Sequence, residues 1–137
     1  SSFVPWSLAN IGSVPVEKYA DAVKGLNLPS FDKDDVEDYI RKSGGIIIAA
    51  KNCTNYAIGV TTATLCEALM YKTDTVLTIS TMMNGEYGIN DVCLSIPAVV
   101  SRNGIASRII APLTDDEIAK LRHSADCLKD VIKQLTF

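Results

Sequence analysis

An alternating run of apolar residues from Asp91 to Val100 constrains the fold of this chain more than any other feature. Every second residue is apolar, which in an extended backbone gives one apolar face. The apolar positions are Val92, Leu94, Ile96, Ala98 and Val100. A β-branched alternating run precedes it at 75–81, and the Asn103-Gly104 hairpin signal leads into a predicted returning strand at 106–113. These patterns predict antiparallel strands with one buried face.

Two prolines complicate this prediction. Pro97 and Pro112 fall inside the second and third predicted strands. Proline has no N–H to donate to a sheet, so we expect these parts of the strands at sheet edges or bulges.

Helical patterns flank the strands. Asp32 is a suitable N-cap for a first long helix, in which the glycine pair Gly44-Gly45 predicts a close contact or a bend. Its apolar face comprises Val36, Tyr39, Ile40, Ser43, Ile47 and Ala50. A second helix at 55–70 is almost free of charge, so we expect it to be buried on most sides, as a subunit interface would allow.

The ends of the chain complete the expected fold. An extended segment is predicted at 6–11, then a short helix near 17–24 and a loop that reaches 33 and includes Pro29. The last helix begins with a capping box, Thr114 to Glu117. Its apolar stripe comprises Ile118, Leu121, Ala125, Leu128, Ile132 and Leu135. The sequence therefore predicts an α+β domain, with antiparallel strands packed against long helices.

Composition excludes several classes of function. A net charge of −3 and a pI of about 5.0 lack the basic footprint of a nucleic-acid-binding protein. No apolar run has the roughly 18 residues that a membrane span needs. The cysteines contain no CxxC pair, which argues against zinc and disulfides and predicts reduced, mostly buried thiols in a cytosolic protein. They are Cys53, Cys66, Cys93 and Cys127. The apolar start, without Met, predicts a piece of a longer protein.

Few residues are placed for catalysis. His123 lies about 200° round the last helix from Leu121, so we expect it to face solvent or a partner. No acid is placed to support it as a base, and no glycine-rich phosphate loop is present. The acidic residues at 32–38 lack the pattern of a calcium loop and indicate a solvated helix N-terminus.

Thr54 is the candidate that remains. If the first long helix continues through it, Thr54 lies five whole turns after Val36 and shares its buried face, with Ile58 one turn further. The hydroxyl would then bond back to its own helix or, beside Ile58, face a ligand cavity. Periodicity leaves both interpretations open.

Ordered phrases along the whole chain resemble the C-terminal half of the L-lactate dehydrogenases, in the lactate/malate dehydrogenase family. These phrases are SFVPWS from Ser2, KNCTNYAIG from Lys51, NGEYGIND from Asn84, SIPAVV from Ser95, NGI from Asn103, and the ending from Leu113 to Asp126. The resemblance implies that residues 1–137 are the substrate domain of an NAD-dependent enzyme that interconverts pyruvate and L-lactate. The NAD-binding Rossmann domain and a GEHGD phrase, with the catalytic histidine, would precede Ser1. This chain alone would then be inactive.

The resemblance also assigns roles to two residues. Thr54 matches the threonine of the family's K-G-x-T phrase, which helps to hold the carboxyl end of the substrate, and it favours lactate over malate. Ile58 matches the isoleucine that packs against the nicotinamide. Departures from the family are Asn52 in place of glycine and Gly44-Gly45 in place of an Ala-Tyr pair. A cytoplasmic homo-oligomer is implied, a tetramer or a dimer. The alternatives are a malate or other 2-hydroxyacid dehydrogenase, or a non-catalytic assembly module that pairs through helix 55–70.

Overall fold

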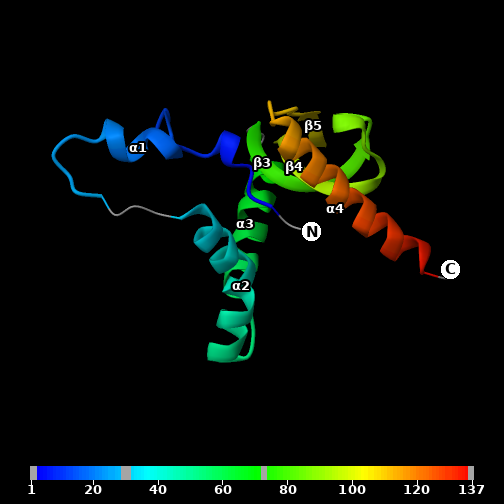
Figure 1. Ribbon diagram of the computed structural model, residues 1–137. Helices are drawn as coiled ribbons and strands as arrows, with labels where there is room; N and C mark the ends of the chain where they lie inside the picture. The colour runs from blue at the N-terminus through cyan, green and yellow to red at the C-terminus, as the bar shows by residue number, and fades with distance from the viewer. Residues whose placement is uncertain (1–2, 29–31, 72–73, 136–137) are drawn as a thin grey trace.

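The computed structural model describes residues 3–28, 32–71 and 74–135, and it has the expected α+β architecture (Figure 1). Residues 29–31, which include Pro29 of the predicted loop, lie outside this description. The elements are η1 (Trp6–Leu8), β1 (Asn10–Ile11), β2 (Val14–Pro15), α1 (Val16–Ala22), α2 (Lys33–Lys51), α3 (Tyr56–Met70), β3 (Thr75–Asn84), η2 (Glu86–Gly88), β4 (Asn90–Ser101), β5 (Gly104–Arg108) and α4 (Asp115–Lys133).

The sheet has the antiparallel order β3-β4-β5, and β4 is its central strand. The predicted apolar face of β4 is confirmed, because all five of its alternating apolar residues are buried. Their neighbours on β3 face the same way: Ile79 pairs with Ile96, and Leu77 pairs with Ala98. Alternation therefore determines both the strand and the face that it buries.

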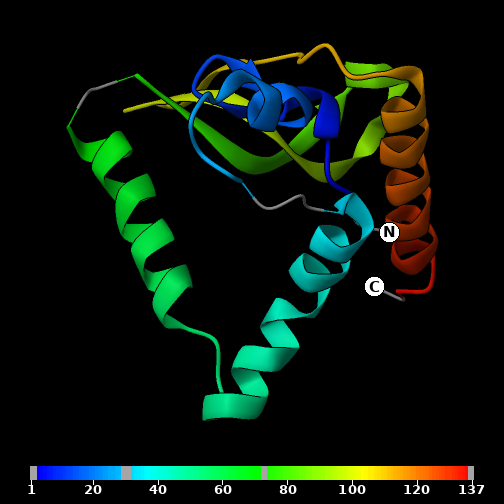
Figure 2. The same cartoon turned by 60° about the vertical axis from the view of Figure 1, so that its left-hand side comes forward.

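Helix α4 packs on this face and completes the core. Leu121 and Ala125 are buried against Met83, Val92 and the neighbouring apolar side chains of the sheet. The predicted capping box is confirmed, with Thr114 and Glu117 bonded in both directions. The stripe is correct only in its first half: Leu128, Ile132 and Leu135 are 40%, 47% and 54% exposed. These later turns extend beyond the sheet (Figure 2).

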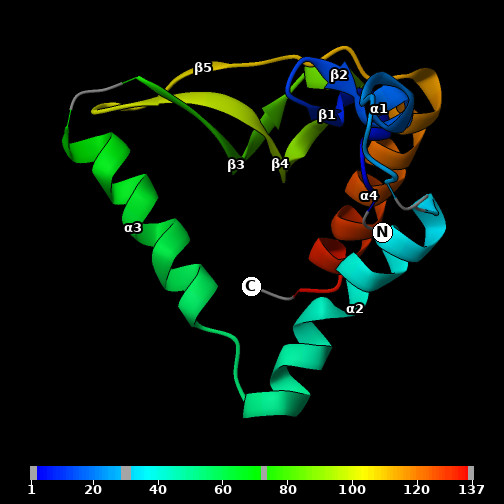
Figure 3. The same cartoon turned by 90° about the vertical axis from the view of Figure 1, so that its left-hand side faces the viewer.

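Helices α2 and α3 diverge from the sheet and meet at the loop 52–55, as the arms of a V (Figures 2 and 3). The prediction that 55–70 is buried on most sides is wrong for the described chain, since Ala68 is the buried residue of α3. The exposed apolar residues of both helices include Tyr39, Ile40, Ile46, Ile47, Ile48, Tyr56, Ile58 and Val60. The physical reason is that the arms point away from the sheet.

The glycine pair in α2 does not mark a close contact within the described chain. The helix runs through Gly44 and Gly45 without interruption, and a Cβ added at either position would meet nothing within 4 Å. The side of α2 that carries Gly44 and Gly45 is therefore not covered by other described residues.

The structure corrects three details of the predicted strands. The returning strand is Gly104–Arg108, and Pro112 lies beyond it. Pro97 is in the central strand, not at an edge, but the ladder of β4 with β5 ends beside it at Arg108. Its carbonyl accepts from the Ile109 N–H at 2.9 Å, so its ring nitrogen faces the side where β5 has ended and no N–H is needed. The predicted extended segment at 6–11 begins instead as the 3-10 turn η1.

The cysteines are free thiols but are not mostly buried, so that prediction is wrong. Cys53, Cys66 and Cys93 are exposed and Cys127 is half-buried. Cys93 lies on the outer face of β4, between the buried Val92 and Leu94. Cysteine is one of the residue types most often buried, so residue type alone does not predict these exposed positions.

Candidate functional site

The loop between α2 and α3 carries Thr54, and it is a helix junction. Helix α2 ends at Lys51, and Asn52 adopts a left-handed conformation with φ of 63° while its N–H donates to the Ile48 carbonyl at 2.7 Å. The premise that one helix continues through Thr54 is therefore wrong, and Thr54 does not share the face of Val36. A left-handed residue after the last turn is a common way to end a helix.

The left-handed conformation explains why asparagine can replace the family's glycine at position 52. Asparagine visits this conformation at low cost, whereas a β-branched residue is strained there. We expect Asn52→Gly to change the free energy of unfolding by a few tenths of a kcal/mol, and Asn52→Val to lower it by about 1–2 kcal/mol. Denaturant unfolding measures both, and equal stability of the two variants would contradict this account of the helix end.

Contacts on both sides hold the junction. The Lys51 ammonium lies 4.2 Å from the centre of the Tyr56 ring, a cation–π contact that joins the end of α2 to the start of α3. The Gly59 N–H donates to the Asn55 carbonyl at 2.9 Å and begins the α3 ladder. Thr54 lies between these two contacts and is half-buried.

Thr54 and Ile58 are four residues apart, and the junction gives them different environments. Ile58 lies in the first turn of α3 and is 63% exposed, which is unusual for a large aliphatic side chain. Back-bonding inside a helix is what Thr61, Thr62 and Thr64 do further along α3. Thr54 precedes α3, so its hydroxyl is outside that ladder. The arrangement offers one hydroxyl and one apolar surface on the same end of the V.

Two other candidates, His123 and Asp32, lie where the sequence predicts them. His123 is exposed on α4, and Asp32 caps α2 by accepting from the Asp34 N–H at 2.8 Å. Among the described residues, no group of three or more histidine, cysteine or acidic side chains is placed to hold a metal ion.

Glu117 makes a tertiary contact that the local sequence patterns did not predict. They predicted only its role in the capping box. It is 6% exposed and accepts from the Ser7 N–H at 3.0 Å, from the Ser7 hydroxyl, and from the Thr114 N–H at 2.9 Å. Burial by itself raises the pKa of Glu117, but the hydrogen bonds from Ser7 and Thr114 outweigh it and lower the pKa to about 2. This carboxylate fastens the N-terminal segment to the start of α4.

The lowered pKa of Glu117 predicts acid sensitivity. Because the carboxylate has a pKa near 4.5 when unfolded and about 2 when folded, its contribution is present above pH 4.5 and is lost as the pH falls towards 2. Unfolding by denaturant between pH 6 and 3 is expected to show a loss of about 2 kcal/mol from this carboxylate, and the total loss should be smaller in Glu117→Gln. Asp126→Asn, on the exposed side of α4, is the control. Identical pH slopes for wild type and Glu117→Gln would contradict the assignment.

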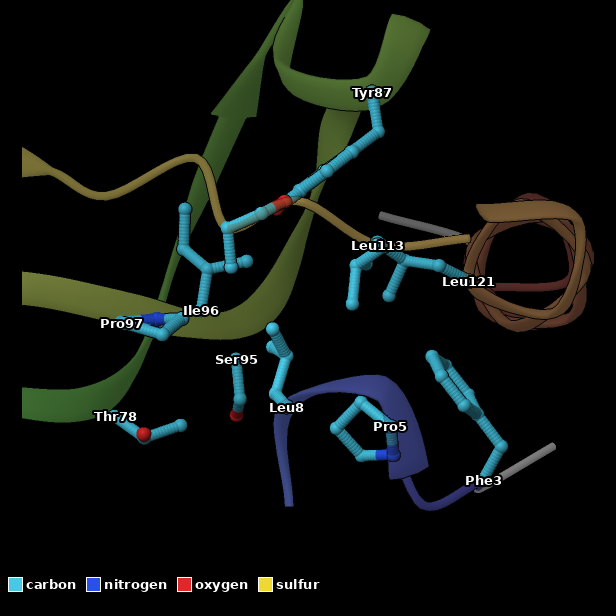
Figure 4. A pocket seen from close by; sticks show the side chains of 11 residues that line it. Phe3, Pro5, Leu8, Thr78, Tyr87, Ser95, Ile96, Pro97, Leu113 and Leu121 are labelled. Carbon is cyan, nitrogen blue, oxygen red and sulfur yellow. The ribbon is translucent and has the colours of Figure 1, made fainter. Parts of the chain in front are cut away.

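A separate cavity of about 430 Å³ lies between the N-terminal segment, the sheet and α4 (Figure 4). Phe3, Pro5 and Leu8 line one side, and Leu113 and Leu121 line another. The Tyr87 hydroxyl donates to the Ala111 carbonyl at 2.9 Å, so this polar group is satisfied by protein. The cavity is largely apolar and does not include Thr54 or Ile58, so it is distinct from the α2–α3 junction.

Within the described residues, no helix has the length and apolar character needed to cross a bilayer.

Known proteins of one family match nearly the whole length of this chain. The family model for the lactate/malate dehydrogenase α/β C-terminal domain matches residues 1–136. An L-lactate dehydrogenase of Thermoanaerobacterium saccharolyticum is 37% identical over 98% of this chain and 43% of its own length. L-lactate dehydrogenase 2 of Clostridium acetobutylicum is 39% identical over 98% of this chain and 42% of its own length.

Solved structures agree with these relatives. A minor L-lactate dehydrogenase from Enterococcus mundtii superposes with a TM-score of 0.85 at 29% identity, over 97% of this chain and 42% of that chain. A malate dehydrogenase from Aeropyrum pernix also matches, with a TM-score of 0.78 at 26% identity over the same shares. The fold is thus shared by enzymes of both names.

The sheet, its covering α4 and the diverging helices form the α/β C-terminal domain of the lactate/malate dehydrogenase type. The chain belongs to the lactate/malate dehydrogenase family. It spans a little under half the length of the curated relatives that it matches.

Proposed function

We propose that the protein carrying this chain is an NAD-dependent L-lactate dehydrogenase, and that residues 1–137 form its substrate-side domain. The observation that carries the proposal is the junction at 51–58, where the half-buried Thr54 and the exposed Ile58 follow the end of α2. The names of relatives at 37% and 39% identity support lactate as the substrate class.

Thr54 and Ile58 would have different roles at the site, one toward the substrate and one toward the nicotinamide. The Thr54 hydroxyl has one donor and two acceptor positions, enough to orient the carboxyl end of pyruvate. Ile58 would present its exposed apolar surface to the nicotinamide side and exclude water there, which strengthens the electrostatics of the reaction. Bound NAD(H) would supply or accept the hydride. The proton would move through a histidine that we expect before Ser1.

A malate dehydrogenase is the second candidate. The match to the Aeropyrum pernix malate dehydrogenase structure favours it, because the fold alone does not separate the two substrates. Thr54 favours lactate, since malate-specific relatives are expected to carry a smaller residue at this position. A broader 2-hydroxyacid specificity belongs with this alternative.

The exposed apolar surfaces of α2 and α3 indicate that this domain contacts other protein. Apolar side chains such as Ile48 and Val60 are at least half exposed on α2 and α3, and surfaces of this kind mark contacts with other protein. We propose that they meet the remaining part of the enzyme and another copy in a cytoplasmic homotetramer, with a dimer as the alternative. A non-catalytic assembly module would use the same surfaces without turnover.

Two observations test the proposal before any mutation. The sequence immediately before Ser1 in the intact protein is expected to contain GEHGD, and a different sequence there removes most of the support for a dehydrogenase. The isolated chain is expected to give no oxidation of NADH with pyruvate, because it has no groups assigned to proton or hydride transfer. Turnover by the pure chain would overturn these residue roles.

A further inference from the structure

We propose that Glu37 is a positioning residue, which fixes the direction of α2 through Trp6 and thereby the place of Thr54. The Trp6 indole N–H donates to the Glu37 carboxylate at 2.8 Å. Glu37 lies about one turn inside the start of α2, and Thr54 follows the other end of this helix. The link to substrate rests on the proposed function, whereas the link between Glu37 and the direction of α2 does not.

Helix α2 is held mainly at its start. Among the described elements, no other helix or strand packs extensively against it, and it points away from the sheet (Figure 3). Its first turns meet the N-terminal segment, where Phe3 and Val4 line a small cavity together with Ile40 and Arg41. The direction of α2 within the described chain therefore depends on contacts near Glu37.

The Glu37 carboxylate is well placed to hold the indole. Its side chain is 17% exposed, and a hydrogen bond to a charged acceptor is stronger than one between neutral groups. Its other oxygen accepts from Arg41 at 2.7 Å, which orients the carboxylate. The Lys33 ammonium lies 5.6 Å from the centre of the Trp6 ring and also pairs with Glu17. Lys33 and Glu37, one turn apart on α2, thus contact the same indole.

The residue after Trp6 connects this contact to the body of the domain. Ser7 donates its N–H, at 3.0 Å, and its hydroxyl to the buried Glu117 carboxylate at the start of α4. Trp6 and Ser7 both belong to the 3-10 turn η1, whose hydrogen bonds limit movement of one residue relative to the other. Two carboxylates, one from α2 and one from α4, therefore hold the two helices through adjacent residues.

Helix α2 would transmit a disturbance at this contact to the junction. Glu37 and Lys51 are on the order of 21 Å apart along the uninterrupted helix, at about 1.5 Å per residue. A tilt of about 5° at the start of such a helix would move its end by about 2 Å. Misplacement of a substrate-holding group by about 1 Å can cost on the order of 100-fold in rate. A small loss of fit at Trp6 would therefore affect Thr54.

The kinetic test compares Glu37→Ala with Asp38→Ala in the intact protein. Asp38 is the matched control, because it is the next residue on α2, is exposed, and forms the same kind of i,i+4 ion pair, with Lys42 at 2.7 Å. Glu37→Ala is expected to lower kcat/KM for pyruvate at least about tenfold. Asp38→Ala should leave it near wild type.

Two conservative variants separate the hydrogen bond from the charge of Glu37. Glu37→Gln keeps an oxygen that can accept from Trp6 and should retain most of the activity. Trp6→Phe keeps a ring but has no N–H donor, so it should behave like Glu37→Ala. Because the two residues act through one contact, Trp6→Phe combined with Glu37→Ala should be no worse than either change alone.

A distance measurement tests the direction of α2 without turnover. Spin labels are placed on Cys53, which is exposed in the junction, and on Asp126→Cys, on the exposed side of α4, with the other cysteines replaced by serine. Glu37→Ala is expected to broaden the distance distribution or shift it by at least about 2 Å. Asp38→Ala should reproduce the distribution of the labelled parent.

The outcomes separate this inference from the proposed function. An unchanged label distance in both Glu37→Ala and Trp6→Phe would overturn the inference. So would kcat/KM in Glu37→Ala equal to that in Asp38→Ala, in a protein that uses pyruvate. If the wild type does not use pyruvate, the proposed function fails, and the label distance alone decides whether Glu37 fixes α2.

Discussion

Replacing Thr54 by alanine in the intact enzyme is expected to lower kcat/KM for pyruvate by roughly 5- to 150-fold, equivalent to about 1–3 kcal/mol. The change removes the hydroxyl that the proposed function assigns to the carboxyl end of the substrate. Thr54 lies outside the helices and is half-buried, so the same change should alter the free energy of unfolding little. Steady-state kinetics with NADH and varied pyruvate measure the effect.

Two further variants make this prediction specific. Thr54→Ser keeps a hydroxyl and should retain most of the activity. Thr61→Ala removes a hydroxyl that donates to the Ala57 carbonyl at 2.9 Å on exposed α3, and it should leave kcat/KM near wild type. Unchanged kcat/KM in Thr54→Ala would leave Thr54 as a structural hydroxyl at a helix junction.

Replacing Met83 by alanine is expected to lower the free energy of unfolding by about 2–5 kcal/mol. Met83 is fully buried, at 0% exposure, where the end of β3 meets Ile89, Leu94 and α4. Truncation removes its apolar contacts and leaves a cavity in a core that contains few fully buried large side chains. Equilibrium unfolding in urea, with a check that the slope is unchanged, measures the loss.

The next residue provides the control for this core prediction. Met82 has the same side chain but points to the outer face of β3, is 47% exposed and pairs with Cys93. Met82→Ala should therefore cost much less than Met83→Ala. A similar loss at the two positions would show that the buried face of the sheet is not the main core of this domain.

The sheet could be predicted because its information is local. Alternation along β4 defines both the strand and its buried face, and the Asn103-Gly104 signal defines the hairpin. The Thr114 capping box likewise begins α4 where the sequence indicates. Each of these features depends on residues within a few positions of one another.

The end of α2 shows where periodicity fails. The apolar pattern continues past Lys51, but the backbone turns left-handed at Asn52, and a period of 3.6 residues carries no information on the sign of φ. The available signal was the residue type, because asparagine and glycine are the residues that most often end helices in this way. Giving that signal more weight would have placed Thr54 in a loop.

Contacts between distant segments could not be predicted from local patterns. Glu117 has the expected role in a capping box, but its bonds to Ser7 join residues 110 positions apart. In the same way, periodicity identifies the apolar faces of α2 and α3 without indicating what covers them. Ile58 is exposed in the described part of the chain. Its assigned role therefore depends on a partner surface and not on packing within this chain.

The most direct test of the central claim is the ratio of kcat/KM for pyruvate to that for oxaloacetate, measured by NADH oxidation with the intact protein. An L-lactate dehydrogenase in which Thr54 helps to hold the substrate predicts pyruvate-dependent oxidation and a ratio well above one. A ratio below one would assign the protein to malate, and no oxidation with either substrate would contradict its assignment as an enzyme of this class.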